Sequence, residues 1–283
     1  MKMLALSDIH QQANKWKILV KTVEEERPDI VCIAGDLIPK NNGILDQINF
    51  IRHMRKYAQK IKDAGSELVL IFGNDDNQLL IPDIEKGMED GLWHYVSDRV
   101  VEVKGYEFCG CPWVTDYPFG YKYWVARETD DVLGIDPEQY GKPVVINSGN
   151  RFVDIPNLAE YLKSKPSIEA SLKKTASQVK DMSRSIWLIH GPPRAFNFDL
   201  CAHGAKVGSQ VVDDFILKHQ PLITMHGHIH EAPEYNGHCW HGYMDKTLSM
   251  QAGQLGFDLH YVTFDLDDVV VSNLKHSIYG EAS

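Results

Sequence analysis

The sequence predicts an α/β protein organised around a parallel sheet. Short apolar segments of strand length end in polar residues, and longer segments with apolar residues at helical spacing lie between them. This alternation is typical of βαβ units, in which helices connect parallel strands by right-handed crossovers. We therefore expect a sheet with both faces covered, and ligands at the carboxyl ends of its strands.

The amino-terminal elements alternate regularly. We expect strands at Met3–Leu6, Asp29–Ala34 and Glu67–Phe72, because each is a short apolar run bounded by polar residues. Helices are expected at Ala13–Arg27, which a proline ends, and at Ile44–Ala64, which a glycine ends. Three strands and two helices in this order predict the first half of a parallel sheet.

The pattern changes after about residue 96. Val100–Lys104 and Tyr106–Cys109 predict two short strands with a turn at Gly105. Pro112–Asp154 is irregular and rich in aromatic residues, so we expect an ordered insertion with a short helix near Tyr121–Asp131. This insertion is either a lid that contacts the substrate or an elaboration that only packs against the domain.

The carboxyl-terminal part continues the sheet and then alternates in the manner of antiparallel strands. We expect a helical region at Leu158–Lys180, broken near Pro166, and a second helix at Gly208–Lys218. Buried strands are expected at Ile186–Ile189 and Leu222–Met225. Antiparallel strands are expected at Thr247–Gln251, His260–Asp265 and Val269–Ser272. The sequence contains no repeat, low-complexity segment or linker, which predicts a single domain over residues 1–283.

The composition excludes several classes of protein. With 43% hydrophobic and 24% charged residues, the chain has the composition of an ordinary globular protein, and no apolar stretch approaches the about 20 residues of a membrane span. A formal net charge of -10 argues against a nucleic-acid binder, which needs a basic surface. The 5 cysteines lack paired spacing, and no signal peptide is evident, so we expect reduced thiols and a cytoplasmic location.

Polar residues with metal-binding side chains follow the predicted strands. They should all lie on one rim of the sheet: Asp8, His10, Asp36, Asn74, His190, His228 and His230. Mixed oxygen and nitrogen donors favour Mn, Fe, Zn or Ni over Mg or Ca. These donors outnumber the ligands of one four-coordinate ion, so the sequence predicts two divalent metal ions that share a carboxylate.

The order of these motifs resembles the calcineurin-like metallophosphoesterases, especially the bacterial and archaeal predicted phosphoesterases. The chain reads DxH at 8–10, GD at 35–36, GN at 73–74, HG at 190–191 and GHxH at 227–230. The resemblance implies a four-layer α/β/β/α sandwich with a dimetal site at the carboxyl ends of the strands.

The resemblance also implies a role for each ligand. It assigns one ion to Asp8, His10 and His230, assigns the other to Asn74, His190 and His228, and makes Asp36 the bridge. The implied reaction is an in-line attack on phosphorus by a hydroxide that bridges the ions, with Mn favoured as the metal.

One motif departs from the family pattern. The family usually has histidine after Gly-Asn, whereas this chain has Gly73-Asn74-Asp75-Asp76. Asp75 can act as an acid only if its pKa is raised, and two adjacent cations would lower it. Asp76 is expected to accept hydrogen bonds and orient a ligand, and His226 is either a substitute acid or the ordinary end of a strand.

Three further residues are candidates for contacts with the substrate. Arg194 follows the HGPP segment and can clamp a phosphate through two hydrogen bonds, with Lys206 and Ser209 as additional candidates. The glycines of QAGQLG at 251–256 stand where the family often has Asn-Pro-Gly-Ser, and we expect only a turn there.

These observations favour a metal-dependent phosphoesterase that hydrolyses a small phosphodiester, such as a cyclic nucleotide or a nucleotide-like ester. The alternatives are a phosphomonoesterase, including a protein phosphatase, or a catalytically impaired metal-binding protein, because Asp75 replaces the usual histidine. A nuclease is the third alternative, against which the acidic composition argues.

Overall fold

The computed structural model describes residues 1–11, 14–39, 44–149 and 151–282, and it confirms the predicted α/β class. The helices with full α-helical turns are α1 (Asn14–Glu26), α2 (Ile44–Asp63), α3 (Ile81–Glu89), α4 (Leu158–Lys163), α5 (Ile168–Ala176), α6 (Gln210–His219) and α7 (Ala232–Tyr235). Ala13, the predicted start of the first helix, lies outside the described residues. Among the described residues, no helix is both long and apolar enough to cross a membrane.

The first sheet has seven strands in the order β16-β15-β14-β1-β2-β3-β4. Their bounds are β1 (Lys2–Leu6), β2 (Ile30–Ala34), β3 (Glu67–Ile71), β4 (His94–Tyr95), β14 (Val262–Asp265), β15 (Lys275–His276) and β16 (Gly280–Glu281). Strands β1 to β3 are parallel, as predicted. The short strand β4, which was not predicted, pairs parallel to β3, and β14 extends the sheet by pairing antiparallel to β1.

The second sheet has six strands in the order β12-β13-β11-β10-β6-β5. Their bounds are β5 (Val100–Val103), β6 (Tyr106–Cys111), β10 (Ser185–Ile189), β11 (Ile223–Met225), β12 (His241–Met244) and β13 (Thr247–Met250). The predicted hairpin is confirmed, with its turn at Gly105, whose φ of 84° is the left-handed conformation that glycine adopts readily. The four inner strands are parallel to one another.

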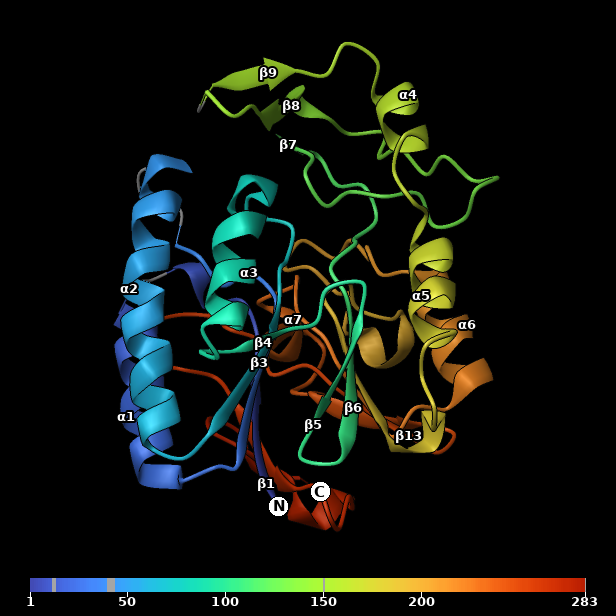
Figure 1. The fold of residues 1–283 in the computed structure, drawn as a ribbon. Helices are drawn as coiled ribbons and strands as arrows, with labels where there is room; N and C mark the ends of the chain where they lie inside the picture. Colours follow the sequence, from blue (N-terminus) through green and yellow to red (C-terminus); the bar gives the residue numbers. More distant parts are fainter. Residues whose placement is uncertain (12–13, 40–43, 150, 283) are drawn as a thin grey trace.

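Alternating residues of the strands face two different cores. In β1, Leu4 and Leu6 belong to the hydrophobic cluster that includes residues of α1 and α2, whereas Met3 and Ala5 belong to the cluster shared with the second sheet. Successive side chains of a strand point to opposite faces, so each sheet is buried on both sides. Figure 1 shows α1, α2 and α3 outside the first sheet and α5 and α6 outside the second.

Two elements of the carboxyl-terminal half differ in detail from the prediction. The helical region 158–180 is broken as predicted, with Pro166 between α4 and α5, and Ser167 caps the second helix by accepting from the N–H of Ala170 at 3.2 Å. The strand predicted at Val269–Ser272 is wrong, because residues 271–273 form a 3-10 turn. The strand β13 confirms Thr247–Gln251, but it pairs parallel to β11 as well as antiparallel to β12.

The insertion forms a small third sheet at the end of the molecule where the parallel strands terminate (Figure 1). Its strands are β7 (Phe119–Tyr121), β8 (Tyr140–Ile146) and β9 (Phe152–Asp154), in the order β7-β8-β9. The helix predicted at Tyr121–Asp131 is wrong. The N–H of Ala126 donates to Val114 and the carbonyl of Trp124 accepts from Val114, so these backbone groups are not available to a helix.

Candidate metal centre

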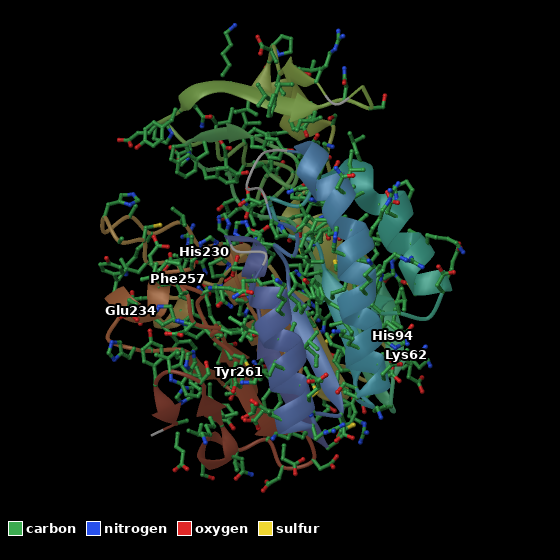
Figure 2. The ribbon with its side chains drawn as sticks, turned by 90° about the vertical axis from the view of Figure 1, so that its left-hand side faces the viewer. Lys62, His94, His230, Glu234, Phe257 and Tyr261 are labelled. Carbon is green, nitrogen blue, oxygen red and sulfur yellow. The ribbon has the colours of Figure 1, made fainter. Side chains whose placement is uncertain are left out.

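The first sheet brings four of the predicted ligands to one rim. Asp8 and His10 follow β1, Asp36 follows β2 and Asn74 follows β3, and all four side chains are buried. The second sheet contributes the rest, because His190 follows β10 directly and the segment with His228 and His230 follows β11. Figure 2 shows His230 below the sheet of the insertion.

One group of ligand atoms forms around Asp8. The ligand atoms of Asp8, His10, Asp36 and His230 all lie within 4.8 Å of one another. His10 Nε2 lies 3.1 Å from His230 Nε2 and 3.4 Å from Asp36 Oδ2, and His230 Nε2 lies 3.4 Å from Asp8 Oδ1. Carboxylate oxygens and imidazole nitrogens that converge in this way suit a divalent transition metal ion.

A second group forms around Asn74. Its Oδ1 lies 2.9 Å from His190 Nε2 and 2.6 Å from His228 Nδ1, and His190 Nε2 lies 3.6 Å from Asp36 Oδ1. Asp36 therefore faces His10 with one carboxylate oxygen and His190 with the other. The chain brings all the predicted ligands together in two groups that share Asp36.

A buried carboxylate oxygen supports the fit to a cation. Asp8 Oδ1 accepts from the backbone N–H of His228 at 3.0 Å, but Asp8 Oδ2 is buried without a hydrogen-bond partner. A buried carboxylate oxygen without a donor is costly, and a divalent cation would compensate that cost.

The glycines of the motifs make room for the ligands. A Cβ atom on Gly73 would lie 2.3 Å from Asp36 Oδ1, and one on Gly227 would lie 2.7 Å from Asp8 Oδ2. A Cβ atom on Gly35, whose φ is 96°, would lie 2.4 Å from His190 Nδ1. Each glycine therefore lets a ligand from another strand approach its backbone closely.

The ligands themselves have an uncommon backbone conformation. Asp8, Asp36 and His228 have φ values of 57°, 53° and 72°, a region that residues with a Cβ atom seldom adopt. Such strain persists where the surrounding structure imposes it, and it is frequent at functional sites.

Charge pairing changes the proton affinity of the ligands. Burial opposes ionisation of His190, but the nearby Asp36 raises its pKa to about 9. Burial likewise opposes ionisation of Asp8 and His230, yet their mutual attraction lowers the pKa of the carboxyl and raises that of the imidazole. Protons on these imidazoles occupy the nitrogens that a cation would need.

The model of one protein family matches residues 1–232, and that family is described as calcineurin-like phosphoesterase. The chain belongs to the calcineurin-like phosphoesterase family. Members of the family are metal-dependent, and the chain is accordingly a metal-dependent phosphoesterase.

Solved structures agree with this fold. A crystal structure of TT1561 of Thermus thermophilus has a TM-score of 0.59 at 15% identity, with coverage of 98% of this chain and 97% of that one. Another crystal structure has a TM-score of 0.62 at 14% identity, with coverage of 100% and 99%. No curated protein matches the chain.

Asp75, where the calcineurin-like pattern usually has histidine, faces His10. Asp75 Oδ2 lies 3.5 Å from His10 Nδ1, while the other ring nitrogen of His10 faces the ligand group. The Asp75 N–H donates to Asp36 Oδ1 at 2.8 Å. A carboxylate on the far nitrogen of a ligand histidine fixes the tautomer and the orientation of the ring.

Asp76 lies behind the predicted metal ligands and does not line the cavity. It is fully buried, and its carboxylate accepts from the backbone N–H groups of Leu37, Ile38 and Gly73 at 2.9–3.0 Å. These bonds join the loops that carry Asp36 and Asn74. The geometry gives Asp76 the expected orienting role and leaves it no contact with a substrate.

His226 does not reach the site. Its Nδ1 lies 3.0 Å from the Ile189 carbonyl and its Nε2 lies 2.9 Å from Thr224 Oγ1, so both ring nitrogens have partners within the core. Burial lowers its pKa to about 4. The sequence left two roles open for His226, a substitute acid or the ordinary end of a strand. We assign it the second, structural role.

The side chains of Arg194 and Ser209 also make contacts away from the predicted metal ligands. Arg194 is half exposed, pairs with Glu128 Oε1 at 3.2 Å and donates to the Gly208 carbonyl. Ser209 caps α6 by accepting from the Val212 N–H at 3.2 Å. Neither side chain lines the cavity above the ligands.

That cavity has a volume of about 1010 Å³ and opens between the insertion and a loop at residues 201–207. Lys206, a candidate for contact with the substrate, lines the cavity, and so do Tyr117 and His203, which the sequence did not single out. The Tyr117 ring centroid lies 5.7 Å from that of His228, and no periodicity or motif marks this tyrosine. Of the two roles considered for the insertion, its residues in the cavity wall favour a lid that contacts the substrate.

Proposed function

We propose that the chain is a dinuclear metal-dependent phosphodiesterase that acts on a small phosphodiester. The observation that supports this most directly is Asp36, whose two carboxylate oxygens face two separate groups of ligands at 3.4 and 3.6 Å. Asp8, His10 and His230 would hold one ion, and Asn74, His190 and His228 the other. When bound, the two ions supply positive charge to the phosphate oxygens and acidify a water molecule at neutral pH.

The protein's own residues position this chemistry. Asp75 holds His10 in one orientation, and Asp76 holds the loops of Asp36 and Asn74 in place. In the hydrolysis, the water oxygen forms a bond to phosphorus as the bond to the leaving oxygen breaks. The attacking water gives up one proton to solvent and the leaving oxygen takes up one proton from solvent, so a diester and water become a monoester and an alcohol.

The choice of a diester follows from the missing acid. Neither candidate acid from the sequence is placed to replace the family's histidine, because Asp75 adjoins His10 as a carboxylate and His226 is enclosed in the core. A general acid matters most for poor leaving groups, so we expect slow hydrolysis of monoesters with poor leaving groups and favour a diester as the substrate.

The donor atoms favour one kind of metal ion, and the state of the cysteines favours one cellular location. We favour Mn²⁺, because the donors combine carboxylate, amide oxygen and imidazole without thiolate. All five cysteines are free thiols, which supports a cytoplasmic location. The acidic net charge of -10 supports a small substrate rather than nucleic acid.

The test measures metal content and turnover together. We expect about two Mn²⁺ per chain and faster turnover of bis-p-nitrophenyl phosphate than of p-nitrophenyl phosphate. Asp36→Asn should lower diester turnover by at least about 100-fold, because both ions lose a shared ligand. A protein that binds no divalent ion would refute the proposal. Faster monoester turnover would establish the monoesterase alternative instead.

A further inference from the structure

The cavity is much larger than a phosphate group requires. Asp36, Asn74, His228 and His230 form its floor, and its volume of about 1010 Å³ lies at the upper end of the range for sites that enclose a whole small molecule. The proposed phosphate position on the floor accounts for only a small part of this space. The walls therefore contact the rest of the substrate.

One wall is aromatic. Tyr117, Phe119, Tyr121 and Tyr140, all from the insertion, line the cavity. Phe119 and Tyr140 are 64% and 59% exposed, and pairing of β7 with β8 places them opposite each other. Their ring centroids lie 5.9 Å apart at 73°, so each ring leaves a face or an edge for a further ring.

This wall is held in place by buried charges. Lys122 Nζ lies 2.7 Å from Asp116 Oδ1, and both side chains are buried. Asp116 Oδ2 accepts from the Asp136 N–H at 3.0 Å and from Gln139 Nε2 at 3.1 Å. The aromatic wall is thus formed before a substrate arrives, which reduces the entropy lost on binding.

The charges around the cavity disfavour a second phosphate. Asp75, Asp136, Glu138 and Glu231 line it. Among the described lining residues the only lysine is Lys206, whose Nζ already donates to Asn197 Oδ1 at 2.7 Å, and there is no arginine. Away from the predicted metal ligands, further negative charge on the substrate would meet these four carboxylates and a single lysine.

We propose that the substrate is a phosphodiester with a single negative charge that carries a flat aromatic group, which stacks on Phe119 and Tyr140. This inference rests on the proposed phosphodiesterase function and adds the chemistry of the part beyond phosphorus. A nucleoside and a simple aryl group are two sources of the same flat ring. Nucleoside diphosphates and triphosphates are excluded by their additional charge.

The test measures binding directly, with ligands that the enzyme does not cleave. Isothermal titration calorimetry on the Mn²⁺-loaded protein compares methyl(phenyl)phosphinate with methyl(cyclohexyl)phosphinate, which contain no ester bond, carry one negative charge each and have nearly the same size. A merely apolar wall would bind the cyclohexyl compound at least as well, whereas stacking requires the flat ring. We expect the phenyl compound to bind about tenfold more tightly.

Three variants test whether Phe119 and Tyr140 cause the preference for the phenyl compound. Phe119→Ala and Tyr140→Ala should remove most of the tenfold preference and leave binding of the cyclohexyl compound nearly unchanged. Phe152→Ala is the matched control, because Phe152 is 65% exposed on the same small sheet but does not line the cavity. The preference should persist in this control.

Each outcome has a definite meaning. No preference for the phenyl compound, or an equal loss in Phe152→Ala, would overturn the inference even if bis-p-nitrophenyl phosphate is hydrolysed. Absence of metal binding and diester turnover would instead overturn the proposed function. Tighter binding of the methylphosphinate of 5′-deoxythymidine, in which a carbon atom replaces the 5′ ester oxygen, than of the phenyl compound would identify a nucleoside as the source of the ring, and weaker binding would identify an aryl group. Binding of thymidine 5′-diphosphate as tight as that of the phenyl compound would overturn the charge argument.

Discussion

At the scale of single residues, the centre is distinguished by a carboxylate where its family usually has an imidazole. Asp75 Oδ2 lies 3.5 Å from His10 Nδ1, and the carboxylate also lines the cavity. A negative side chain here repels the phosphate oxygens and cannot protonate a leaving group while it stays ionised. The same carboxylate favours one orientation of His10.

Asp75→His should shift the enzyme toward monoesters. An imidazole at this position can donate a proton to the leaving oxygen, so we expect kcat/KM for phenyl phosphate, a monoester with a poor leaving group, to rise about tenfold or more relative to that for bis-p-nitrophenyl phosphate. Asp75→Asn is the control, because it removes the charge without adding an acid. An equal rise in both variants would show that charge alone limits monoester turnover.

The raised pKa of His190 predicts that cation affinity depends on pH. With a pKa of about 9, His190 is protonated at pH 7.5 in the metal-free protein, and a cation must displace that proton from the ring. Below pH 9, each unit decrease in pH should therefore weaken cation binding by about tenfold at this group of ligands. His226, with a pKa lowered to about 4, is neutral at pH 7.5 and contributes no proton.

Calorimetry in buffers with different ionisation enthalpies checks this prediction. At pH 7.5 we expect at least one proton to be released as Mn²⁺ binds. Binding that releases no proton and does not vary between pH 7 and pH 9 would contradict the assignment of His190 as a ligand.

At the scale of elements, two buried glutamines hold the loops that carry the ligands. Gln254, in the loop after β13, donates to the Ser7 carbonyl at 2.9 Å through Nε2, and its N–H donates to the His230 carbonyl at 2.9 Å. Its Oε1 accepts from the buried Lys15 ammonium at 2.8 Å. Gln47 of α2 donates to the Asp75 carbonyl at 2.8 Å.

Replacing these glutamines should affect the two ions differently. Gln254→Leu loosens the loops of Asp8 and His230, so we expect a 10- to 100-fold loss of affinity at that group of ligands only. Gln47→Leu is its matched counterpart and should weaken the ion near Asn74. Metal analysis after dialysis against limiting Mn²⁺ should find about one ion per chain in each variant. Retention of two ions in both variants, or loss of both, would refute the separate roles.

The strands and their terminal residues could be predicted because both depend on local sequence. An apolar run that ends in a polar side chain indicates both the strand and the rim, which is why the sequence predicted that Asp36 and His190 lie at the ends of strands. The prediction of a helix at residues 121–131 is wrong because Val114, outside that segment, takes up the backbone hydrogen bonds of Trp124 and Ala126. Such pairing leaves no periodic signal.

The walls of the site could not be predicted for a related reason. Arg194 was selected because it follows a metal motif, but Glu128 of the insertion pairs with it outside the cavity. Tyr117 and Gln254 contact the site region through segments that carry no motif. Their importance depends on how the insertion and the loop after β13 cross the rim of the sheets, which sequence spacing does not specify.

At the scale of the whole molecule, the proposed metal centre connects the two sheets. Asp36 and Asn74 come from the seven-stranded sheet, and His190 and His228 come from the six-stranded sheet. The insertion is anchored in the same structure, because Trp124 Nε1 donates to the Asp76 carbonyl at 2.7 Å. We therefore propose that residues 1–283 form one domain that unfolds as a unit and is stabilised by its cations.

Thermal unfolding with and without metal should reveal this coupling. Cations that bind only the folded state stabilise it by about 2.7 kcal/mol per site at 100 times the dissociation constant. For a chain of this length, we expect Mn²⁺ to raise Tm by about 5–10 °C and a chelator to reverse the change. Asp36→Asn should lose most of the increase, whereas Asp131→Asn, at an exposed position that does not line the cavity, should keep it. If the chelator leaves Tm unchanged or Asp36→Asn keeps the full increase, the cations do not join the sheets. If the fluorescence of the tryptophans in the insertion changes in a separate thermal transition, the insertion unfolds by itself and the chain is not a single cooperative unit.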